Sequence, residues 1–206
     1  MRRNAGNTVS SLIMESGASF VATLFFFILG ISAGIFTELM MGSTEKQGIL
    51  AYLDKYLLLS TFENVTFSDI FLSSAGNNLS LLMIIILSGF TAIGFPAALV
   101  AVTYKGMALG FSAALLIDTM SYKGVALVFT SMLPQNLIII PTILIASIAA
   151  LNVAFHTISN RRLGIKKSLA ESSGPYILLN IVLILAILAG CIIESFVSPL
   201  LTQLIV

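Results

Sequence analysis

The chain has 206 residues, of which 58% are hydrophobic and 9% charged, and its net charge is +1. A soluble domain carries about 25% charged residues, so this composition excludes a water-soluble globular protein. The mean hydropathy of +1.06 predicts an integral membrane protein with an all-α fold, embedded in membrane lipid. The single cysteine, Cys191, excludes an intrachain disulfide, and one histidine without paired Cys/His spacing predicts no metal site.

The first predicted membrane segment covers residues 18–40. It is long enough to cross the membrane, because about 20 helical residues span the hydrocarbon core. Arg2 and Arg3 precede it and no small-residue cleavage pattern follows, so we expect an uncleaved helix with its N-terminus in the cytoplasm. Gly30 and Gly34 form a GxxxG pair, which is compatible with close helix contact and equally with the ordinary flexibility of a membrane helix.

Residues 42–77 form the one sizeable polar stretch, which holds two basic and four acidic side chains. Apolar residues at roughly helical spacing over 49–59 predict an amphipathic helix lying at the outer membrane interface, and a solvated connector is the alternative. An exposed stripe rich in leucine and tyrosine is also typical of a partner-docking surface. The candidate docking residues are Tyr52, Tyr56, Leu57 and Phe62.

The second and third predicted segments cover residues 79–102 and 106–120. Pro96 lacks a backbone donor and clashes with the preceding turn, so we expect a kink in the second segment. Lys105 lies between the two segments, where we expect it to anchor the chain at the cytoplasmic interface. The alternative is a functional charge that pairs with groups at a break in a later segment or guards a cavity.

The fourth predicted segment covers residues 124–155 and is broken at Pro134–Asn136. Because residues 124–133 are too few to span the membrane alone, we expect one long, bent element. An inner loop over 156–175 follows, with four Lys and Arg residues. The fifth segment covers 176–196.

The distribution of basic residues predicts five transmembrane helices with the N-terminus inside and the C-terminus outside. This arrangement places seven of the ten Lys and Arg residues on the inner side, in agreement with the positive-inside rule. A re-entrant hairpin formed by the third segment and the front of the fourth would instead place the basic residues of 161–167 outside. The charge count therefore favours five crossings.

No catalytic constellation is apparent, so the sequence predicts neither an enzyme nor a cofactor. His156 has no acidic partner nearby in the sequence and is expected at the membrane interface. Glu38, Asp118 and Glu194 fall near predicted outer helix ends, where a carboxylate reaches water; an ion-pathway carboxylate is the alternative. Phosphate-binding Gly-Lys-Ser/Thr loops and basic residues interleaved with aromatic ones are both missing, so we expect no nucleic-acid partner.

Three features carry a resemblance to a known family: the Asn77–Asn78 pair, the KGxxxGF element that starts at Lys105, and the LPQNxxxxP element that starts at Leu133. In their order and spacing they resemble the stage II sporulation protein M family of multi-pass membrane proteins. The resemblance covers about residues 70–160, together with the hydropathy profile of the whole chain. The residues that we expect to be structural packing positions are Pro96, Lys105, Gly106, Gly110, Phe111, Pro134, Asn136 and Pro141.

The resemblance implies a role in endospore formation, during engulfment of the forespore by the mother cell. It implies a cell-membrane scaffold at the sporulation septum that localises two peptidoglycan hydrolases, a lytic transglycosylase and an amidase/endopeptidase. Our hypothesis is that residues 42–77 dock these hydrolases. The alternative is a permease-like component with a polar cavity near Lys105 and Pro134–Asn136, because a broken segment and glycines are suited to a gate. The glycine pairs also leave a homodimer open.

Overall fold

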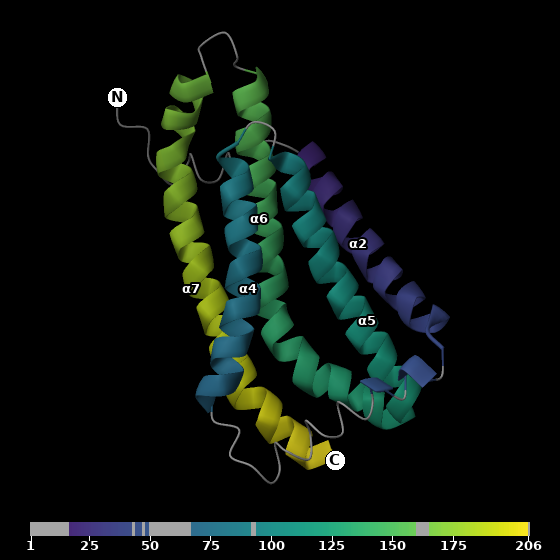
Figure 1. Cartoon of the computed structure of the whole chain (residues 1–206). Helices are drawn as coiled ribbons and strands as arrows, with labels where there is room; N and C mark the ends of the chain where they lie inside the picture. Colours follow the sequence, from purple (N-terminus) through teal and green to yellow (C-terminus); the bar gives the residue numbers. More distant parts are fainter. Residues whose placement is uncertain are drawn as a thin grey trace.

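The computed structural model describes residues 17–42, 44–46, 48–49, 67–91, 94–159 and 165–205, and within them every regular element is helical. The elements are α2 (Gly17–Met40), α4 (Phe67–Gly89), α5 (Phe95–Leu127), the π-helical turn η1 (Val128–Met132), α6 (Leu133–Ser159) and α7 (Ile165–Ile205). The long helices run side by side. The upper end of the bundle in Figure 1 carries the start of α2 and the end of α4, and the lower end carries the end of α2 and the start of α4.

Among the residues that the structure describes, four helical runs are long and apolar enough to cross a membrane: Gly17–Leu39, Phe67–Gly89, Phe95–Ile158 and Gly174–Phe196. Their length and composition are compatible with membrane spans. The third run has 64 residues, which as a straight helix would measure about 96 Å, roughly three times the hydrocarbon core.

This long run is not straight, because Ser121 has a positive φ of 52° inside α5. The chain reverses there so sharply that a Cβ at Gly124 would collide with the backbone of Leu116. From this reversal, α5 and α6 run side by side in opposite directions (Figure 1).

The structure moves the boundary between the second and third predicted segments. α4 begins at Phe67 and ends at Gly89, and α5 begins at Phe95. The predicted segment 79–102 therefore contains the true break, whereas the predicted break between 102 and 106 lies in continuous helix. Hydropathy placed the start of α4 too late, because the serines and asparagines of 67–78 lower the average although two of them, Ser74 and Asn78, are buried in the bundle.

Pro96 lies in the first turn of α5, so the predicted kink was wrong. Proline is tolerated there because the first N–H groups of a helix have no intrahelical acceptor. A tight connection precedes it, in which the N–H of Thr91 donates to the carbonyl of Ser88 and the N–H of Gly94 donates to that of Thr91. A Cβ at Gly94 would collide with both residues, so this reversal requires glycine.

The predicted break at Pro134–Asn136 is a π-helical turn rather than an interruption. Pro134 lacks an N–H group and its ring opposes the carbonyl of Thr130, four residues earlier. The chain widens to a π-helix over Val128–Met132, directly before the proline, and continues as α6 through Pro141. A π-helical turn is a common way to accommodate such a residue in a membrane helix.

α2 and α5 meet through four glycines: Gly30 and Gly34 of α2, and Gly106 and Gly110 of α5. A Cβ at any of them would collide with a backbone atom of the opposite helix. Gly30, for example, faces the carbonyl group of Thr103. The missing side chains let the two backbones touch, so the structure favours close helix contact for the Gly30–Gly34 pair. We call these four residues the glycine interface.

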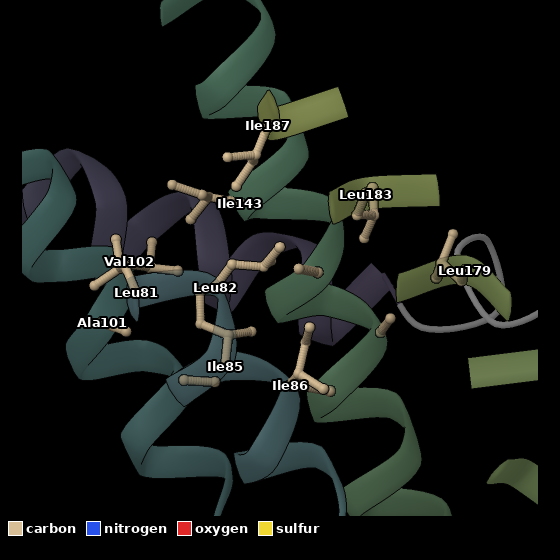
Figure 2. Close-up of a cluster of buried hydrophobic side chains, with 14 of the residues drawn as sticks. Leu81, Leu82, Ile85, Ile86, Ala101, Val102, Ile143, Leu179, Leu183 and Ile187 are labelled. Carbon is tan, nitrogen blue, oxygen red and sulfur yellow. The ribbon is translucent and has the colours of Figure 1, made fainter. Parts of the chain in front are cut away.

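The apolar core lies between α4, α5, α6 and α7 (Figure 2). Lipid is as apolar as leucine, so complementary packing, not the hydrophobic effect, has to hold these helices together. Large hydrophobic side chains on the outward faces of the helices are exposed, as expected where lipid is the solvent. The fully buried aliphatic residues that point toward one another in this core include Leu82, Ile85, Val102, Ile143 and Ile187.

Tyr176 joins α7 to α4 near the upper end of the bundle. Its buried hydroxyl donates a hydrogen bond to the carbonyl oxygen of Ile86 at 3.0 Å, and its ring lies edge-on to Phe90. Gly89 provides the space, because a Cβ there would collide with the hydroxyl. The bond satisfies a polar group at a depth where water is scarce.

Candidate functional site

A series of hydrogen-bonded polar side chains crosses the bundle from α5 through α4 to α7. Lys105 Nζ donates to Asn78 Oδ1 at 2.8 Å. Asn78 Nδ2 lies 3.0 Å from the carbonyl oxygen of Ser74 and 3.4 Å from its hydroxyl. The Ser74 hydroxyl donates to Glu194 Oε2 at 2.5 Å. We call Lys105, Asn78, Ser74 and Glu194 the polar chain.

The polar chain starts near the middle of two antiparallel helices. At 1.5 Å per residue, Lys105 lies about 15 Å from the start of α5 and Asn78 about 16 Å from the end of α4. Because both distances are measured from the same tight connection, the two side chains lie at the same depth. The prediction that Lys105 anchors the chain at a cytoplasmic turn was therefore wrong: the turn lies at residues 90–94 and Lys105 is inside the bundle.

The centre of the polar chain is buried and its charged ends are partly exposed. Asn78 and Ser74 are each 7% exposed, whereas Lys105 and Glu194 are intermediate. A charge in the hydrocarbon region is costly, and such residues usually face the bundle interior and pair with one another. Here the opposite charges come from α5 and α7, and the two polar side chains of α4 bridge them.

Cys191 lies beside the polar chain and is fully buried. Its Sγ is 4.0 Å from Asn78 Nδ2, and its backbone carbonyl accepts a hydrogen bond from the Ser195 hydroxyl of the same helix. A buried thiol in such a setting acts mainly as a small packing group with weak hydrogen bonding. This position gives Cys191 a structural role in the packing of α7 against α4.

A second charged cluster joins the lower ends of α2 and α5. Lys46 Nζ lies 2.6 Å from Glu38 Oε1 and 2.7 Å from Asp118 Oδ2. The Glu38 side chain is 1% exposed and that of Asp118 is 52% exposed. Hydrogen bonds, first to Asp118 and then to Glu38, raise the pKa of Lys46 above its usual value. The sequence predicted both carboxylates at helix ends, but not that Lys46 bridges them, because Asp118 is distant from Lys46 in sequence.

The other predicted packing residues do not join the polar chain. The backbone of Phe111 faces Gly34 and extends the glycine interface. Asn136 donates from Nδ2 to the carbonyl of Met132 in the preceding π-helical turn, at 2.8 Å. The predicted polar cavity that would link Lys105 to Pro134–Asn136 therefore has no hydrogen bond between the two to support it.

The candidate docking residues Tyr52, Tyr56, Leu57 and Phe62 lie outside the described part of the chain. Where the structure resumes, Phe67 stacks on Phe71, with ring centroids 5.9 Å apart, and contacts Phe196 of α7 at 4.5 Å. Phe67 and Phe196 are both exposed. An exposed aromatic cluster thus lies at the start of α4, within the polar stretch 42–77 and at the lower end of the bundle (Figure 1).

Among the residues that the structure describes, no group of three or more His, Cys, Asp or Glu side chains is placed to hold a metal ion. His156 lies in the last turn of α6, at the upper end, far along the bundle from Glu194. The polar chain offers an ammonium, an amide, a hydroxyl and a carboxylate in series. Such a series can hold two opposite charges inside a membrane and take up or release a proton at its ends.

The family model described as stage II sporulation protein M matches residues 23–199. Comparisons with curated proteins and with solved structures gave no match. The matched region includes both the glycine interface and the polar chain. The chain therefore belongs to the stage II sporulation protein M family and is a sporulation-related membrane protein.

Proposed function

We propose that the protein is a non-enzymatic membrane scaffold that anchors septal peptidoglycan hydrolases during engulfment of the forespore. Its partners are a lytic transglycosylase and an amidase/endopeptidase, and its location is the sporulation septum and then the engulfing mother-cell membrane. The observation that carries the proposal is the family match, because it extends over all the membrane helices and not over one motif.

The topology that fits this role has five crossings, with the upper end of Figure 1 in the cytoplasm. The run Phe95–Ile158 contributes two of them, because the chain reverses at Ser121. In the sequence, six of the ten Lys and Arg residues precede α2 or follow α6, namely Arg2, Arg3 and four within 161–167, whereas Lys46 and Lys55 lie between α2 and α4 and Lys123 follows the reversal at Ser121. The start of α2 and the end of α6 are at the upper end of the bundle, and the end of α2 and the start of α4 are at the lower end. The positive-inside rule therefore supports a cytoplasmic N-terminus and an outer C-terminus.

In this topology the stretch between α2 and α4 lies outside, on the side of the cell wall. The exposed rings of Phe67 and Phe196 lie at the same end. Aromatic residues that are exposed at an aqueous surface are typical anchors of protein interfaces. We assign the docking of the hydrolases to this surface, with Tyr52, Tyr56, Leu57 and Phe62 as the contact residues.

The test replaces residues 48–64 with a Gly/Ser linker of equal length, which leaves Lys46 and the start of α4 intact. We expect normal membrane levels of the protein and loss of hydrolase recruitment, measured by septal fluorescence of tagged hydrolases and by co-purification from sporulating cells. The matched control replaces residues 160–164 at the opposite end and should leave recruitment unchanged. Wild-type recruitment by the first variant would refute docking at this surface.

A further inference from the structure

We propose that the polar chain is a membrane-embedded proton-binding site, in which a proton taken up by Glu194 releases α7 from α4. The ligand is a single proton from the aqueous side at the lower end of the bundle. This proposal is independent of hydrolase docking, because it concerns side chains between the helices and not the surface that follows α2.

The first argument is the direction of the hydrogen bonds. Lys105 donates to Asn78, and Ser74 donates to Glu194. The Ser74 hydroxyl has one proton, which goes to the carboxylate, so it receives the Asn78 amide as an acceptor at 3.4 Å. With Glu194 as a carboxylate, all donations within the polar chain run from the cationic end to the anionic end, and bonds aligned in this way polarise and strengthen one another.

This order depends on an ionised Glu194. A protonated carboxyl group is itself a donor and carries no negative charge, so it competes with the Ser74 hydroxyl for the same position. The ammonium of Lys105 would then lack a counter-charge in an apolar environment, which is strongly unfavourable. Protonation at one end of the polar chain is thus felt at the other end, on a different helix.

The charged groups around Glu194 are few enough to assign. Lys105 faces it from α5, and Cys191 lies one turn away on α7 itself. α4 contributes Ser74 and Asn78, which do not titrate, and carries the carboxylate Asp69 in its first turn, five residues before Ser74. Within the described residues of η1 and α6 the single titratable side chain is His156, at the opposite end of the bundle.

The position of Glu194 gives it access to protons from water. Glu194 and Lys105 are both partly exposed, but Glu194 lies close to the end of the apolar stretch Gly174–Phe196, whereas Lys105 lies about 15 Å from the start of α5. The proton adds to the carboxylate as H⁺ from water and no bond is broken other than the hydrogen bond from Ser74. The Asn78 amide carries no titratable proton, so the polar chain couples two charges without conducting a proton between them.

Loss of the hydrogen bond between Ser74 and Glu194 loosens the contact between α4 and α7 at the lower end of the bundle. Ser74 and Glu194 are within two turns of Phe71 and Phe196, whose aromatic cluster joins the same two helices at the lower end. Uptake of the proton removes the polar link between α4 and α7 there, while the Tyr176 hydrogen bond still holds them near the upper end.

The experiment measures thermal unfolding of the full-length protein in lipid nanodiscs between about pH 7 and pH 4, the range in which carboxyl groups take up protons. For the wild type we expect the midpoint to fall by about 5 °C or more on acidification. Glu194→Gln should abolish most of this fall, because its uncharged amide cannot titrate. The matched control Glu38→Gln removes a buried carboxylate outside the polar chain and should retain the fall in the midpoint on acidification.

Two further measurements keep the proposal testable if one variant folds poorly. Infrared difference spectra should show a protonated carboxyl signal on acidification that is lost in Glu194→Gln and kept in Glu38→Gln. The double variant Lys105→Met, Glu194→Gln should unfold at a higher temperature than Lys105→Met alone, because it leaves no unpaired charge. A pH dependence in Glu194→Gln equal to that of the wild type, or an infrared signal lost only in Glu38→Gln, overturns the proposal.

Discussion

The glycine interface and the polar chain use neighbouring residues of one helix in opposite ways. Gly106 faces α2 with no side chain at all, whereas Lys105, one position earlier, reaches α4 with a long charged side chain. Both solve the same problem, because helices in lipid gain nothing from hiding apolar surface and need either close backbone contact or polar bonds. The first contact is sensitive to any added atom and the second to any lost partner.

The largest expected effect comes from adding atoms to the glycine interface. Gly34→Ala places a Cβ against the backbone of Met107 and Phe111, which cannot move aside as a side chain can. We expect the free energy of unfolding to fall by about 3 kcal/mol, measured by denaturation in mixed micelles. Gly76→Ala is the matched control, since a Cβ there meets nothing within 4 Å. Equal stability of the two variants would mean that the helices do not touch here.

The polar chain should respond instead to the loss of a partner. Asn78→Leu removes the bridge between Lys105 and Ser74 and leaves the ammonium unpaired. We expect unfolding to become easier by about 2 kcal/mol. Asn77→Leu is an adjacent control with the same chemistry, because Asn77 is exposed. A similar effect of both substitutions would argue against the bridge.

A single neutral hydrogen bond gives a smaller effect. Tyr176→Phe removes the hydroxyl that donates to Ile86 but keeps the ring against Phe90. The expected loss is about 1 kcal/mol. Tyr104→Phe makes the same chemical change on an exposed side chain and should leave unfolding unchanged. If both variants match the wild type, the hydroxyl of Tyr176 contributes nothing to the stability of the bundle.

The smallest effect concerns pH at the Lys46 cluster. Hydrogen bonds to Asp118 and Glu38 raise the pKa of Lys46 in the folded protein. The ion pairs therefore stabilise the fold fully below the pKa of Lys46 in the unfolded chain, about 10.5. This stabilisation is lost as the pH rises through the pKa of Lys46 in the folded protein. The melting temperature of the wild type should therefore decline at alkaline pH above this point. Lys46→Met should lack this part of the decline, and Lys123→Met should keep it. A wild-type profile in Lys46→Met would contradict the assignment.

Much of the fold could be predicted from the sequence, because its apolar stretches and charge distribution are strong signals. The first helix was expected over 18–40 and is found over Gly17–Met40. Hydropathy failed over 67–78, where it treats Ser74 and Asn78 as polar surface although both are buried by contacts with other helices. The same averaging hid the short turn at 90–94, because its residues are apolar or small.

The polar chain could not be predicted for a related reason. Lys105 and Glu194 were each noticed as charges near membrane segments, but a boundary error of about ten residues placed Lys105 at a surface. Once α4 and α5 are joined at 90–94, equal distances from that turn pair Asn78 with Lys105. The remaining partner, Glu194, is distant in sequence, so only the packing of α7 brings it to Ser74.

The reversal at Ser121 has a consequence for how the chain enters the membrane. Gly124 already touches the backbone of Leu116, so no connection is left between α5 and α6 that could remain on the cytoplasmic side while one helix crosses. In the proposed topology both helices have to be translocated together as one hairpin. Asp118 and Lys123, which flank its tip, then cross the bilayer in the same event, and Ser121 is the first residue of this half of the protein to reach the outside.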